Sequence, residues 1–173
     1  DLILEALTLY YNRSDLSFQF RLELNKALVL HKKGLTKEAR TILNKLELVA
    51  EVNNFYYLVL DVMHAQAQMT DSTDERKRIR EKVENKINEI KNNYDYLRVK
   101  LSLEEVTNKY GKCLPGELVS DFNKILDDPL MSSEENAITF HSSSIFYGVK
   151  LKYYRLILNH EKENEFALKR MHL

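Results

Sequence analysis

The sequence predicts an all-α protein built from antiparallel helical hairpins that stack side by side. Two observations lead to this fold class. Apolar residues recur at spacings of three and four along most of the 173 residues, which is the period of one face of an α-helix. Only four glycines and two prolines are present, and this scarcity of helix-breaking residues suits long helices joined by short turns.

The clearest hairpin surrounds a tight break at Gly34. We expect this glycine to take the left-handed conformation that ends the first helix. Thr36 is expected to cap the second helix, and the small side chain of Ala39 lets the two helices approach closely. The apolar stripes that would pack together are Leu24, Ala27, Leu28 and Leu30 before the break, and Leu35, Ala39, Ile42, Leu43, Leu46 and Val49 after it.

Small and large residues of this hairpin resemble the pattern of a tetratricopeptide repeat, at Ala27, Leu30, Gly34, Ala39, Leu43 and Leu46. The match covers roughly one unit of 34 residues. The chain departs from that pattern because it lacks the early aromatic residue, has Lys26 where leucine is usual, and has no proline after the second helix. The resemblance implies a tetratricopeptide-like α-α solenoid, in which the hairpins wind as a right-handed superhelix. In such a solenoid the first helix of each hairpin lines a concave face that binds a peptide.

The remaining segments read as further helices of similar length. Residues 2–11 are expected to form the second half of a preceding hairpin, and Ser14 or Asp15 can cap the helix that follows. The asparagine pairs 53–54 and 92–93 are predicted to be breaks between helices. Hairpins are accordingly predicted at about 16–52, 55–91, 94–127 and 134–171.

Three local signals set the expected helix ends in the second half of the chain. Pro115 suits the first turn of a short helix, and Pro129 pushes the residue before it away from helical angles, which ends that helix. Ser133, followed by two glutamates, is expected to cap the longest apolar helix, at about 134–159. A last helix is predicted at about 163–171.

Length and composition limit the possible classes of protein. A chain of 173 residues is typical of one domain, so we predict a single helical-repeat domain over residues 1–173, and because it begins at Asp1 without methionine we expect it to be part of a longer chain. Basic and acidic residues both number 26, so no net charge draws the protein to nucleic acid. The apolar runs are too short to span a bilayer, so we expect no membrane insertion. The single cysteine, Cys113, fits a reducing compartment, and we expect a cytoplasmic location.

The sequence contains no complete motif for catalysis, a cofactor or a metal. His160 and Glu161 begin like the helix of a zinc protease, but Asn164 stands where that motif needs a second histidine. The serines that follow His141 lack the glycine-flanked strand-to-helix turn of a nucleophile elbow. We therefore expect no enzymatic activity, no cofactor and no metal site.

The leading hypothesis is a non-catalytic module for protein–protein interaction or scaffolding that binds a peptide or partner segment on the concave face. The candidate partner-binding residues are Arg21, Asn25, Leu28 and Lys32, which helical spacing places on the exposed side of the first helix of the best hairpin. Arg21 and Asn25 can hold a carboxylate or a peptide backbone. The competing interpretation is that all four are ordinary surface residues.

Two alternative functions remain open. The domain can be the sensing part of a larger regulator. It can also bind nucleic acid through residues 147–155, where tyrosines and cations lie close together in the sequence. The neutral overall charge argues against nucleic acid as a partner. Burial of the tyrosine rings between helices also explains this segment.

Overall fold

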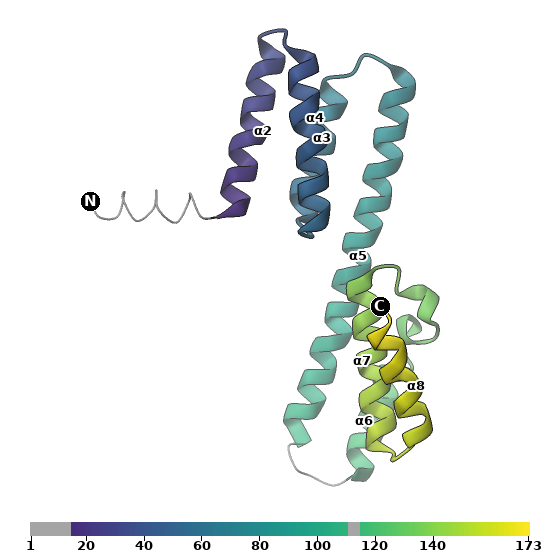
Figure 1. Cartoon of the computed structure of the whole chain (residues 1–173). Helices are drawn as coiled ribbons and strands as arrows, with labels where there is room; N and C mark the ends of the chain where they lie inside the picture. Colours follow the sequence, from purple (N-terminus) through teal and green to yellow (C-terminus); the bar gives the residue numbers. More distant parts are fainter. Residues whose placement is uncertain (1–14, 111–114) are drawn as a thin grey trace, which may run out of the picture. The chain divides into compact units, whose positions relative to one another are not determined.

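The computed structural model describes residues 15–110 and 115–173, and within these ranges every regular element is a helix (Figure 1). The all-α prediction is therefore confirmed. Contacts between residues divide the chain into two units, Asp1–Lys86 and Ile87–Leu173, and helix α5 (Thr73–Tyr110) contributes residues to both.

Unit 1 contains α2 (Leu16–Lys32), α3 (Thr36–Val52), α4 (Tyr56–Gln68) and the first part of α5. Helix α2 packs against α3, and α3 packs against α4. Small residues lie where α2 and α3 meet, since Ala27 and Ala39 are completely buried. The core of the unit is formed mainly by Phe20, Ala27, Ala39, Leu43, Ala50, Val59 and Val62. The half-hairpin predicted at 2–11 lies outside the described residues.

The ends of α2 and α3 test three sequence predictions. Asp15 caps α2, because its carboxylate accepts a hydrogen bond of 2.8 Å from the backbone N–H of Ser17. Gly34 has φ = 81°, which confirms the left-handed conformation. The prediction that Thr36 caps α3 is wrong: Leu35 is the capping residue and makes no side-chain hydrogen bond. The Thr36 hydroxyl instead lies 3.2 Å from Nδ1 of His31, so it is used by the preceding helix.

Unit 2 contains the rest of α5, then α6 (Pro115–Leu126), two short 3-10 helices, α7 (Phe140–Leu156) and α8 (His160–Met171). Helix α7 packs against α8 and α6. Helix α6 begins at Pro115 and ends before Pro129, as the two prolines indicate. The core of this unit is formed mainly by Tyr96, Val99, Leu103, Phe122, Met131, Phe146 and Val149.

The break predicted at Asn92 and Asn93 is wrong, because α5 continues through both residues. Asparagine disfavours a helix when its side chain competes for the local backbone, but here both side chains bond to a distant segment. Asn92 donates to the carbonyl of Asn136 at 2.7 Å and accepts from the N–H of Ile138 at 3.2 Å. The side-chain oxygen of Asn93 accepts a hydrogen bond from the hydroxyl of Thr139. The hydrogen bonds of the two asparagines thus hold the segment at the start of α7 against α5.

The helix predicted at 134–159 begins later than expected. Ser133 caps only the 3-10 helix Glu134–Asn136, which follows another at Pro129–Met131. Thr139 caps α7 through a reciprocal pair of hydrogen bonds with Ser142: the N–H of Ser142 donates to the threonine hydroxyl at 3.1 Å, and the N–H of Thr139 donates to the serine hydroxyl at 3.0 Å. Helix α8 begins at His160, three residues before the predicted start.

Candidate functional site

Helix α2 carries apolar residues on two opposite sides. One side, centred on the buried residues Phe20 and Ala27, packs into the core of unit 1. On the other side, Phe18, Leu22 and Val29 are 40%, 48% and 51% exposed, and none of them belongs to that core. Because each residue turns an α-helix by about 100°, these three positions fall within about 40° of one another, directly opposite Phe20. We refer to Phe18, Leu22 and Val29 as the outer stripe.

Three of the four sequence-predicted site residues border the outer stripe. Arg21, Asn25 and Lys32 are exposed and form a polar row along one edge of it. Leu28 does not join them, because it is half-buried and packs against the core. This agrees with its place in the predicted core stripe, and the prediction that it lies on the exposed side is wrong.

Sequence reasoning missed the outer stripe although its signal is present. Positions 18, 22 and 29 follow the spacing i, i+4 and i+11, which marks one face of a helix as clearly as the core stripe does. A helix with two opposite apolar stripes is expected to pack on both sides. For the described residues, the packing of α2 uses only one of them.

The electrostatics of this face favour an anionic group. Arg21 and Lys32 supply two cations along the polar row, and on the opposite edge the carboxylate of Glu23 is already paired with Lys26. The pKa of Asp15 is lowered mainly by the hydrogen bonds from Ser17 that form the helix cap. A carboxylate placed beside Arg21 can accept two parallel hydrogen bonds from the guanidinium group.

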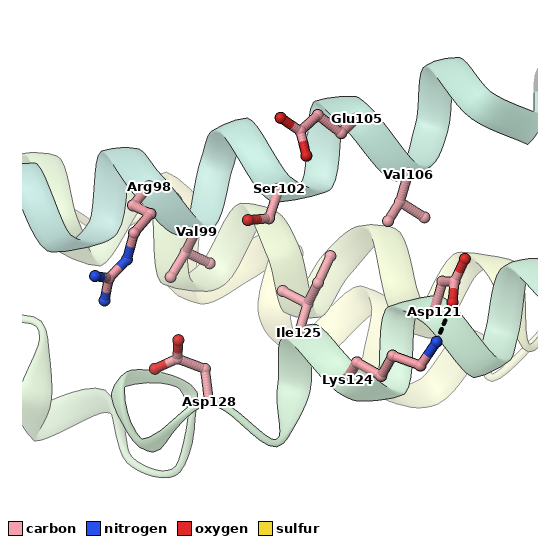
Figure 2. Close-up of a pocket in the computed structure, with 9 residues that line it drawn as sticks. All are labelled: Arg98, Val99, Ser102, Glu105, Val106, Asp121, Lys124, Ile125 and Asp128. Atoms are coloured by element: carbon pink, nitrogen blue, oxygen red, sulfur yellow. Dashed lines mark hydrogen bonds and ion pairs between the residues drawn. The ribbon is translucent and has the colours of Figure 1, made fainter.

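A second candidate is a cavity of about 320 Å³ in unit 2, between α5 and α6 (Figure 2). Its apolar lining comes from Val99, Val106 and Ile125, with the Ser102 hydroxyl pointing between the two helices. The charged lining residues are Arg98, Glu105, Asp121, Lys124 and Asp128. The volume is in the range of small-ligand sites.

The charged groups around this cavity mostly serve the fold. Asp121 forms ion pairs with Lys124 at 2.5 Å and with Lys109 at 3.0 Å. Asp128 caps the 3-10 helix that follows α6, where its carboxylate accepts the N–H of Leu130 at 2.9 Å. The hydrogen bonds of these two carboxylates are thus directed to the protein itself.

Unit 1 contains a more polar cavity of about 260 Å³ lined by α3, α4 and α5. At its centre the Glu47 carboxylate pairs with Lys82 at 2.9 Å and accepts a hydrogen bond of 2.8 Å from the Gln66 amide. Burial acts to raise the pKa of Glu47, but the bonds from Lys82 and Gln66 outweigh it and leave the pKa below its usual value. Arg40 bonds to the carbonyl of Met69 at 2.9 Å and pairs with Glu75 at 3.3 Å. These contacts join three helices.

The tyrosines of α7 and Ser142, which are candidate functional groups in the sequence, have structural roles. Tyr154 stacks on Phe166 of α8 with ring centres 5.4 Å apart, and Tyr147 lies 6.2 Å from the same ring. Tyr153 faces Phe122 of α6 at 6.4 Å. The tyrosines of α7 therefore pack between helices, as the burial interpretation predicts. Ser142 is buried in the cap of α7.

No group of three or more histidine, cysteine, aspartate or glutamate residues in 15–110 and 115–173 is arranged to hold a metal ion. His160 lies 3.3 Å from the carboxylate of Glu163 on its own helix. Cys113 lies outside the described residues. In the same ranges, no helix combines the length and the apolar character needed to cross a bilayer.

The fold and the site together define an all-helical protein with an exposed apolar face on α2 that is bordered by the cations Arg21 and Lys32. Comparison of the chain with protein-family models, with curated proteins and with solved structures finds no significant match. The functional assignment therefore depends on the geometry of the chain itself.

Proposed function

We propose that this protein is a non-catalytic, tetratricopeptide-like helical-repeat module that binds a segment of a partner protein on α2. The observation that carries the proposal is the outer stripe, which lies opposite the core face of the same helix and is bordered by Arg21, Asn25 and Lys32. An exposed apolar face with a polar border is typical of protein interaction sites. We also propose a cytoplasmic location, which the presence of only one cysteine supports.

The energetics indicate that the partner must use the polar row as well as the stripe. Complete burial of a large apolar side chain contributes about 1.5–3 kcal/mol. The three stripe residues are about half exposed, so covering them contributes roughly 2–4 kcal/mol. Association costs at least about 4 kcal/mol in lost freedom of motion. A hydrogen bond to a charged group adds about 1.5–3 kcal/mol, and Arg21 is placed to make one.

The partner segment that fits has two or three apolar side chains and a nearby carboxylate. The apolar side chains would cover Phe18, Leu22 and Val29, and the carboxylate would lie against Arg21. Asn25, in the middle of the row, can donate to and accept from an exposed peptide group. Both an extended segment and an amphipathic helix satisfy these requirements.

The test is capture of partner proteins from the source cell by the full chain and by matched variants. Leu22→Asp and Val29→Asp should abolish capture of specific partners, because a carboxylate replaces the apolar contact. Leu48→Asp is the control for these two, since Leu48 is 64% exposed on α3 and lies outside the core. Circular dichroism should show the same helix content for every variant.

Charge reversal tests the polar row separately. The combined substitutions Arg21→Glu, Asn25→Asp and Lys32→Glu should weaken capture of the same partners, whereas Lys45→Glu, on an exposed site of α3, should not. Capture that is unchanged by both sets of variants would show that α2 is not the binding face.

The two alternative functions have less support. A sensing domain of a larger regulator would use the same face of α2, so the capture experiment addresses it as well. Nucleic-acid binding through residues 147–155 needs exposed rings, and the rings of Tyr147, Tyr153 and Tyr154 are packed against other aromatic residues.

A further inference from the structure

Helix α5 also has an apolar face that lies outside the protein core. Within unit 2, Tyr96, Val99 and Leu103 of this helix are buried in the core. On the other side of the helix, Ile87, Tyr94 and Leu101 are 49%, 54% and 50% exposed and follow one another at intervals of seven residues.

Two further apolar residues complete a continuous seam. Ile90 and Leu97 fall between the three exposed residues and are half-buried, and neither belongs to the core clusters. The five residues Ile87, Ile90, Tyr94, Leu97 and Leu101, which we refer to as the heptad seam, therefore alternate spacings of three and four. This is the a and d pattern with which one helix packs against another in a coiled coil. The seam is about 21 Å long at 1.5 Å per residue.

The flanks of the heptad seam are basic over its central part. Lys91 and Arg98 occupy one flank, and Lys100 lies on the other. Two weak contacts moderate this charge within the helix: Arg98 lies 4.0 Å from Asp95, and Lys100 lies 3.8 Å from Glu104. All three basic side chains are exposed, so they remain available to a partner that covers the seam.

The charges argue against a second copy of the chain as the occupant. Two antiparallel copies of the seam would bring Lys91 close to Arg98 of the other copy. Two parallel copies would bring Lys91 close to Lys86. Like charges at the flanking positions of a coiled coil disfavour the pairing, whereas glutamate or aspartate at those positions would complement Lys91, Arg98 and Lys100.

We propose that the heptad seam of α5 binds an α-helix of another protein, one that presents a matching apolar seam flanked by acidic residues. This interface is separate from the face of α2, because it uses a different helix. Its test does not depend on the proposed function.

The test uses two synthetic peptides of about 21 residues, which is three heptads. Both carry leucine and isoleucine at the a and d positions. One has glutamate at the flanking positions and the other has lysine there. Binding to the full chain is measured by the fluorescence anisotropy of the labelled peptide. The acidic peptide should bind at least about tenfold more tightly than the basic one, and added salt should reduce the difference.

Variants of the chain locate the binding. Tyr94→Asp and Leu101→Asp should each weaken binding of the acidic peptide at least about tenfold. Leu168→Asp is the control, because Leu168 is 56% exposed on α8 of the same unit. The double variant Lys91→Glu with Arg98→Glu should reverse the preference of the chain, so that the basic peptide binds more tightly than the acidic one. This variant changes only exposed charges, so it remains informative if the aspartate variants unfold.

Several outcomes would overturn the proposal. These are equal affinity for the two peptides, no binding of either peptide, or an equal loss of binding in the Leu168→Asp control. Analytical ultracentrifugation supplies an independent check. A dimer that Tyr94→Asp dissociates would show that a second copy of the chain covers the seam.

Discussion

Replacing Asn92 with alanine tests the unexpected continuity of α5. The Asn92 side chain makes two hydrogen bonds to the segment before α7, one of 2.7 Å to the Asn136 carbonyl and one of 3.2 Å from the Ile138 N–H. Each bond contributes about 0.5–1.5 kcal/mol net, so the pair contributes about 1–3 kcal/mol. Alanine is the better helix former by roughly 0.6 kcal/mol, which offsets part of this loss.

The control is Asn88→Ala, because Asn88 is an exposed asparagine on the same helix. The two variants gain the same helix propensity, so the difference between their free energies of unfolding isolates the two hydrogen bonds. Urea titration followed by circular dichroism should place Asn92→Ala about 1–3 kcal/mol below Asn88→Ala. Hydrogen exchange should show faster exchange of the Ile138 amide only in the first variant. If the two variants unfold at the same urea concentration and the Ile138 amide exchanges at the same rate in both, the proposed role of Asn92 is refuted.

Three further predictions concern stability. Burial raises the pKa of Tyr96 to about 12, above the value of 10.0 expected for the unfolded chain. The free energy of unfolding should therefore fall as the pH rises from about 10 to about 12. Tyr96→Phe should make this fall smaller, and a fall of the same size in the variant would contradict the assignment. Gly34→Ala should lower the free energy of unfolding by about 1–2 kcal/mol through backbone strain alone, because φ is 81° and no atom lies within 4 Å of the added Cβ. The urea midpoint measures this loss, and an unchanged midpoint would contradict it. Ala39→Leu should lower the free energy of unfolding by about 1–3 kcal/mol, because the larger side chain overpacks a completely buried position. A variant that is more stable in thermal unfolding would show that α2 and α3 are less closely packed than described.

The sequence predicts the local features of the fold well where the signal is contained within a few residues. The left-handed Gly34, the Asp15 cap and the helix start at Pro115 each follow from the chemistry of one residue and its neighbours. Helix periodicity also identifies the buried side of α2, because the core stripe recurs at regular spacing.

The largest error in the predicted helices occurs where distant residues decide the structure. Asn92 and Asn93 continue a helix because their partners lie 44 to 46 residues away in the chain. Ser133 carries a sequence signal that resembles the Thr139 cap, but it begins only a 3-10 helix of three residues. Local propensity does not contain the continuity of α5, since tertiary hydrogen bonds outweigh it. The cap of α7 is a local feature, because Thr139 and Ser142 are three residues apart.

The candidate site could be predicted in part. Arg21, Asn25 and Lys32 lie where helical spacing indicates, because long polar residues opposite a core stripe are exposed. Leu28 was placed both in the core stripe and on the exposed side, and its packing against the core agrees with the first placement. The outer stripe was detectable as a second set of apolar positions, but only the structure shows that those side chains remain exposed.

The most direct test of a binding face on α2 is site-specific crosslinking in the source cell. A photo-reactive amino acid placed at position 22, in the outer stripe, should form a discrete adduct with another protein. Mass spectrometry should locate the crosslink beside apolar residues and a carboxylate. The same amino acid at position 48, on the exposed side of α3, should form no such adduct. Equal crosslinking at both positions, or none at position 22, would contradict the assignment of this face to a partner.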